Sequence, residues 1–146
     1  MADVKTFFST EEIADIKSAI EGAMSRTSGE IRLRVGKKAG KNPLLSARAA
    51  FLELGMRGAA MKNGVLFYVW VEDKKFAVLG DDGIDQKVPE GFWESVKDVV
   101  LVKFRQKDFA IGLAGGINMA AEKLAEFFPG EDGTEKNPVD VVSYEE

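Results

Sequence analysis

The chain has 146 residues, a formal net charge of −4, and neither cysteine nor histidine. A chain of this length favours one domain around a single hydrophobic core, and its scattered basic residues argue against a nucleic-acid partner. The missing residue types exclude disulfides, zinc–thiolate sites, Ser-His-Asp triads and phosphohistidine, so any catalysis must use carboxylates, other side chains or an oxygen-preferring metal.

The N-terminal sequence carries no sign of export or membrane insertion. It lacks the basic region and the apolar stretch of about 7–15 residues that mark a signal peptide. No run of the sequence approaches the roughly 20 apolar residues that cross a bilayer. We therefore expect a cytoplasmic protein without a membrane span.

The first half of the chain predicts a helix, a strand and a second helix. Ser9 and Glu12 form a capping box ahead of apolar residues at helical spacing, so a helix should run to about residues 27–29. Residues 30–35, EIRLRV, alternate between polar and apolar and predict a half-exposed strand. Asn42 and Pro43 are typical of a helix start, and this helix should reach about residue 56.

The second half predicts a hairpin followed by two helices. Residues 65–71, VLFYVWV, are apolar on both faces and indicate a central strand, which a tight turn joins to a strand over 75–79. Helices are expected over about 90–106 and from residue 109 to about 128. We expect Trp70, Phe92 and Trp93 to anchor the core. Residues 130–146 are acidic and predict a tail without fixed structure beyond a single domain of residues 1–129.

The order α-β-α-β-β-α-α predicts an α/β fold, a three-layer α/β/α sandwich around a short, mixed, twisted sheet. The strand–helix–strand connection favours parallel pairing of the first two strands, and the hairpin makes the third antiparallel. In that topology Glu30, Asn63 with Gly64, and the loop at 80–85 should meet at one end of the sheet.

The loop that this topology brings to the sheet end is acidic. Residues 79–93 read LGDDGIDQKVPEGFW, with Asp81, Asp82 and Asp85 close together. Crowded carboxylates repel one another unless a cation neutralises them. Oxygen ligands without histidine or cysteine suit Ca²⁺ or Mg²⁺, and Gly83 would permit a positive φ in a tight ligand loop. We therefore consider a cation site at these aspartates, with Glu30 as a further ligand.

Two observations limit this interpretation. The spacing does not follow an EF-hand, which needs acidic or amide side chains at alternate positions and a glutamate at the twelfth. Asp-Gly loops are most often polar turns in which the aspartates cap backbone amides. From the spacing alone, both a cation site and an ordinary turn remain open.

Several segments together resemble the TPM domain, in order and over roughly residues 7–129. They are FFSTEEIADIKSAIE, TSGEIRLRV, NPLLSARAAFLELGM, KNGVLFYVWVEDKKFAVLGDDGID, VPEGFWESV and FRQKDFAIGLAGGI. The family takes its name from thylakoid-lumen and photosystem-repair proteins and a nematode acetylcholine-receptor modulator. No single motif among these segments would be sufficient, but their combination is specific.

The resemblance implies an α/β sandwich with a divalent-cation site, typically for calcium, near the loops at one end of the sheet. The family's Gly-Asp and Gly-Ile motif corresponds to Gly80, Asp81, Gly83 and Ile84. Its Gly-Glu-Ile motif corresponds to residues 29–31, and its Asn-Gly motif to residues 63–64. Plant members are described as weak acid phosphatases, and many members carry a signal peptide and a membrane segment, which this sequence lacks.

Three functions follow as alternatives. The first is a divalent-cation-binding domain, with Ca²⁺ favoured and Mg²⁺ possible, that has weak phosphatase activity on a phosphate ester. The second is a non-catalytic module that binds a protein partner linked to the maintenance of a membrane complex, in which the metal only orders the loops. The third is a structural domain without a bound ion. The sequence offers carboxylates for a metal but no convincing nucleophile or general acid, so we favour cation binding.

Overall fold

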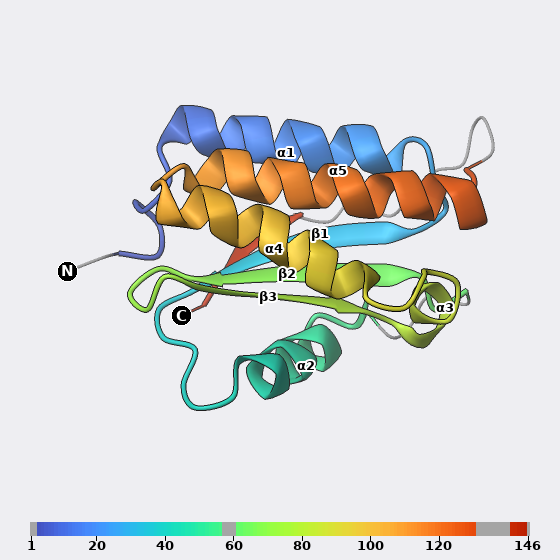
Figure 1. Ribbon diagram of the computed structural model, residues 1–146. Helices are drawn as coiled ribbons and strands as arrows, with labels where there is room; N and C mark the ends of the chain where they lie inside the picture. The colour runs from blue at the N-terminus through green and yellow to red at the C-terminus, as the bar shows by residue number, and fades with distance from the viewer. Residues whose placement is uncertain (1–2, 57–60, 131–140, 146) are drawn as a thin grey trace.

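The computed structural model describes residues 3–56, 61–130 and 141–145. A four-stranded mixed sheet forms its middle layer. Helix α2 (Pro43–Glu53) covers one face of the sheet, and helices α1 (Thr10–Met24), α4 (Phe92–Arg105) and α5 (Phe109–Phe127) cover the other (Figure 1). This arrangement confirms the predicted α/β sandwich.

The remaining elements are short. They are the strands β1 (Glu30–Gly36), β2 (Gly64–Trp70), β3 (Lys75–Gly80) and β4 (Val142–Tyr144), and the single helical turn α3 (Asp82–Asp85). No helix in the described part of the chain is long and apolar enough to cross a membrane.

The strands lie in the order β3-β2-β1-β4. β1 and β2 are parallel, with Glu30 opposite Gly64, and β2 and β3 are antiparallel, with Val65 opposite Gly80. Every residue of β2 is buried, as expected for a strand covered by helices on both faces. Both predicted pairings are therefore confirmed.

The sheet separates two hydrophobic clusters. The larger one lies under α1, α4 and α5 and includes Phe67 of β2, whereas the smaller one lies under α2 and includes Phe51 and Trp70. Alternation along β2 explains the division, because Val65, Phe67 and Val69 belong to the larger cluster and Leu66, Tyr68 and Trp70 to the smaller one.

The helix starts predicted from Ser9 and Asn42 are confirmed, and one helix end differs from the prediction. In the capping box of α1, the Glu12 N–H donates to the Ser9 hydroxyl at 3.0 Å and the Ser9 N–H to the Glu12 carboxylate at 2.8 Å. Asn42 caps α2. That helix ends before the expected residue 56, because Gly55 adopts the left-handed conformation (φ 71°) that terminates helices.

The C-terminal end corrects the expectation of an unstructured tail over 130–146. Residues 142–144 form β4, which pairs in parallel with β1, and Val141 and Val142 are buried. Neighbouring apolar residues and a free edge on β1 give this segment both core surface and backbone partners, and these outweigh its acidic composition. Residues 131–140 lie outside the described part of the chain.

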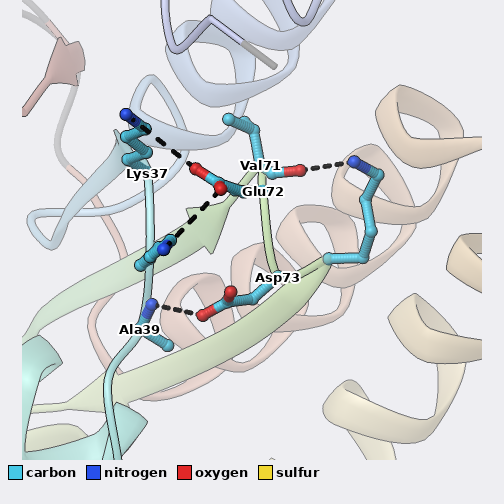
Figure 2. A network of polar contacts seen from close by, with 7 residues as sticks. Lys37, Ala39, Val71, Glu72 and Asp73 are labelled. Atoms are coloured by element: carbon cyan, nitrogen blue, oxygen red, sulfur yellow. Dashed lines mark hydrogen bonds and ion pairs between the residues drawn. The ribbon is translucent and has the colours of Figure 1, made fainter. Parts of the chain in front are cut away.

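At the hairpin end of the sheet, polar contacts fasten the loop after β1 to the turn between β2 and β3 (Figure 2). The Ala39 N–H donates to the Asp73 carboxylate at 2.8 Å, and Glu72 lies 4.0 Å from the Lys37 ammonium and 3.7 Å from that of Lys38. These acidic side chains therefore have partners at the end opposite to Asp81.

Docking of β4 produces a pH-dependent contact. The Tyr68 hydroxyl donates to the Glu145 carboxylate at 2.7 Å. Burial of the phenol, followed by this hydrogen bond, raises the pKa of Tyr68 from 10.0 to about 12. Between these values the folded state keeps a proton that the unfolded chain loses, so the contribution to stability is complete below pH 10 and disappears as the pH rises toward 12.

We predict that the free energy of unfolding in urea falls more steeply between about pH 10 and 12 in the wild type than in Tyr68→Phe. The variant supplies the control, because every other titratable group is the same in both proteins. Equal pH slopes would show that the phenol carries no such linkage.

Candidate cation-binding site

Three segments meet at the end of the sheet where β1 and β2 begin and β3 ends. Glu30 lies opposite Gly64. The Asp81 N–H donates to the Gly64 carbonyl at 2.9 Å, and the Ile84 N–H donates to the Lys62 carbonyl at 3.2 Å. The predicted meeting of Glu30, the Asn63–Gly64 segment and the 80–85 loop is confirmed, and backbone hydrogen bonds maintain it.

The Asn63 side chain makes a structural contact at this end of the sheet. It is buried, and its amide donates to the Ser28 hydroxyl at 3.2 Å. A Cβ atom on Gly29 would lie 2.9 Å from the Asn63 carbonyl oxygen. These contacts join the segment before β1 to the segment before β2, away from the aspartates.

The acidic loop is a helical turn rather than an open loop. Asp81 is its N-cap and accepts a hydrogen bond from the Asp82 N–H at 2.8 Å. The Asp85 carboxylate accepts a hydrogen bond from the Trp93 indole N–H at 2.9 Å. Asp81 is buried, at 6% exposure, while Asp82 and Asp85 are exposed. Capping of an amide, the ordinary role of aspartate in such turns, is therefore one use of Asp81.

Gly83 corrects one detail of the sequence analysis. It lies in α3 and is not among the glycines with positive φ. Glycine is needed here for space, because a Cβ atom would collide with the backbone carbonyl oxygen of Met61. The close approach of the turn to the segment before β2 therefore depends on Gly83. At Gly80, the Trp93 ring occupies the space that a side chain would need.

The three aspartates line one cavity of about 510 Å³ between α2, β3 and α4. Arg48 of α2 and Trp93 of α4 also line it. Neither was assigned to the site from the sequence, where Trp93 was expected to be a core anchor. The sequence could have indicated Arg48, because it lies four residues from both Leu44 and Leu52 and so shares a helix face with them. Both leucines line the same cavity.

Glu30 does not join the aspartates. Its carboxylate lies 2.8 Å from the Arg32 guanidinium on the same strand. β2 lies between Glu30 and Asp81. The side chains of Phe51 and Met56 cover Gly64 at the start of β2, at 3.4 and 3.5 Å from the position that a Cβ atom there would take. In the described ranges 3–56, 61–130 and 141–145, no group of three or more acidic side chains is arranged to hold a metal ion.

The family follows from comparison with known proteins. Residues 1–123 match the family model of the TPM domain. This chain belongs to the TPM domain family. The TPM domain is also similar to the BA42 protein of the psychrophilic bacterium Bizionia argentinensis, whose NMR structure is 34% identical, with 99% of this chain and 100% of that chain covered and a TM-score of 0.88.

More distant structures share the fold of this TPM domain. An N-terminal domain from P. gingivalis is 17% identical, with 83% of this chain and 78% of that one covered and a TM-score of 0.66. The N-terminal domain of the cg2496 protein from Corynebacterium glutamicum is 15% identical, with 91% and 80% covered and a TM-score of 0.59. Comparison with curated protein sequences finds no match.

The role of Gly83 can be tested with a matched pair of substitutions. Gly83→Ala should destabilise the domain by about 1–3 kcal/mol, because the added methyl group meets a backbone carbonyl that cannot rotate away. Gly22→Ala, in α1 with open space around it, should instead stabilise by roughly 0.5–1 kcal/mol. Urea unfolding measures both changes. A Gly83→Ala protein as stable as the wild type would mean that the turn does not lie against Met61.

Proposed function

We propose that this TPM domain binds a divalent cation, Ca²⁺ in preference to Mg²⁺, at Asp81, Asp82 and Asp85. The observation that carries the proposal is that all three carboxylates line one cavity, beside a sheet end held together by backbone hydrogen bonds. Oxygen donors of this kind favour hard cations over zinc or copper.

The three carboxylates supply oxygen donors of the type that calcium prefers, and the remaining ligand positions are left to backbone carbonyls and water. Ca²⁺ takes six to eight oxygen ligands in irregular geometry and accepts backbone carbonyls and water, whereas Mg²⁺ requires a near-ideal octahedron. Asp81 is held by the hydrogen bond that it accepts from the Asp82 N–H, and the side chains of Asp82 and Asp85 are exposed. Glu30 stays outside the proposed ligand set because Arg32 neutralises it.

Weak phosphatase activity is a second candidate, favoured by Arg48 in the same cavity. A guanidinium group binds phosphate oxygens in a bidentate manner, and the chain has no cysteine or histidine to act as a nucleophile. When bound, a divalent cation supplies Lewis acidity toward a phosphoryl oxygen. Phosphomonoester hydrolysis that is lost both in Arg48→Gln and on chelation would favour this activity. Cation binding without hydrolysis would favour a module in which the ion orders the loops.

Calcium should raise the melting temperature, since a ligand that binds only the folded state stabilises it by mass action. At a hundredfold excess over the dissociation constant the gain is about 2.7 kcal/mol, which corresponds to roughly 5–10 °C for a domain of this size. The shift should disappear in Asp81→Asn/Asp82→Asn, and it should weaken as acid protonates the carboxylates. Thermal unfolding with and without calcium measures it.

Two controls make this measurement specific. Asp15→Asn/Asp98→Asn removes the same charge from exposed positions on α1 and α4 and should keep the full calcium shift. Sodium chloride at equal ionic strength should produce a smaller shift, because it acts only by screening. A melting temperature indifferent to millimolar calcium and magnesium would leave the aspartates with the role of an ordinary polar turn.

A further inference from the structure

The outer edge of β3 ends the sheet with unused backbone groups. The Asp81 N–H points toward β2, where it meets the Gly64 carbonyl. Backbone direction alternates along an antiparallel strand, so Phe76, Val78 and Gly80 direct their N–H and C=O groups away from β2. No strand of the described chain pairs with this edge. Such an edge can accept a further strand from another chain.

An apolar groove follows the same edge. A second cavity of about 590 Å³ is lined by Phe76, Val78 and Leu101, and it shares Leu44, Val78 and Trp93 with the cavity at the aspartates. The two cavities together form what we call the β3 groove. Leu44 and Leu52 on its α2 side are 45% and 61% exposed, so this side of the groove presents apolar side chains to solvent.

The charges at the two ends of the β3 groove are opposite. The end near Gly80 carries the three aspartates with a single arginine, Arg48, and the end near Phe76 carries Lys74, Lys75 and Lys97 with a single glutamate, Glu94. The five residues between, 76–80, are uncharged. Lysines on an edge strand commonly prevent aggregation, but here they occupy only one end. The residues whose backbone groups face outward, Phe76, Val78 and Gly80, are apolar or have no side chain.

We propose that the β3 groove binds an extended segment of a partner protein, added as an antiparallel strand to β3. Antiparallel addition places the N-terminal end of the segment beside the aspartates and its C-terminal end beside the lysines. The segment therefore has basic residues first, then about five residues with alternating apolar side chains, then acidic residues. Hydrogen bonds to the β3 backbone provide affinity, and the charged ends fix the direction. This inference does not depend on the bound cation.

The test uses two synthetic peptides with blocked ends, KRVTVTVDE and the charge-swapped DEVTVTVKR, added to the full chain in the presence of a chelator. KRVTVTVDE should bind at least about fivefold more tightly, and the amide signals of Phe76, Val78 and Gly80 should shift most. Lys75→Glu should weaken its binding about fivefold, whereas Arg26→Glu, an equal charge change at an exposed residue near the end of α1, should not.

Backbone methylation of the peptide separates strand addition from simple charge attraction. N-methyl groups on the alternate residues that face β3 should abolish binding, and N-methyl groups on the intervening residues should leave it within about threefold. Equal effects of the two methylation patterns, equal affinity for the two peptides, or no binding at millimolar peptide would each overturn the proposal. Because no cation is present, these outcomes are independent of the calcium experiment.

Discussion

The structure depends on the backbone pairing of β2, a fully buried strand whose two edges are occupied by β1 and β3. A buried strand without partners would leave polar N–H and C=O groups away from water, at a cost of about 1–3 kcal/mol each. The parallel and antiparallel registers fix the position of both neighbours. Glu30 and Gly64 therefore begin their strands at one level, and Asp81, directly after the end of β3, lies at the same level, although long stretches of sequence separate the three residues.

The aspartates at this end of the sheet make structural contacts and are also the proposed cation ligands. Asp81 caps the turn that follows β3, and Asp85 accepts the indole hydrogen bond of Trp93. Both contacts order the turn without a metal. In the proposed complex the cation therefore meets a turn that is already folded, and binding exchanges side-chain contacts worth about 1 kcal/mol each for ligand bonds. In the described residues no three acidic side chains are already arranged as metal ligands, so the proposed complex requires the aspartate side chains to change their contacts.

The sequence predicted those parts of the fold that depend on local patterns. The alternation of EIRLRV and the buried run VLFYVWV predicted the strands, and the capping box at Ser9 and the N-cap at Asn42 predicted the helix starts. Topology then predicted the meeting of three segments. The pairing of β4 with β1 was not readable in the same way. β4 was missed because a strand of three residues has almost no periodicity of its own and forms only against the free edge of β1. Spacing placed Glu30 and Arg32 on one face of a strand and Arg48 on one face of a helix with Leu44 and Leu52. That Glu30 pairs with Arg32, and that Arg48 and Trp93 share a cavity with the aspartates, depends on three-dimensional side-chain placement.

The most direct test of the account is the location of calcium binding, followed through backbone amide chemical shifts during a calcium titration at constant ionic strength. If the aspartates bind calcium, saturable shifts should be concentrated at residues 81–85 and in the neighbouring 62–64 segment, and the Trp93 indole signal should move as Asp85 changes partner. Saturable shifts centred instead on Glu72 and Asp73 at the opposite end of the sheet, or no saturable shifts at millimolar calcium, would contradict it.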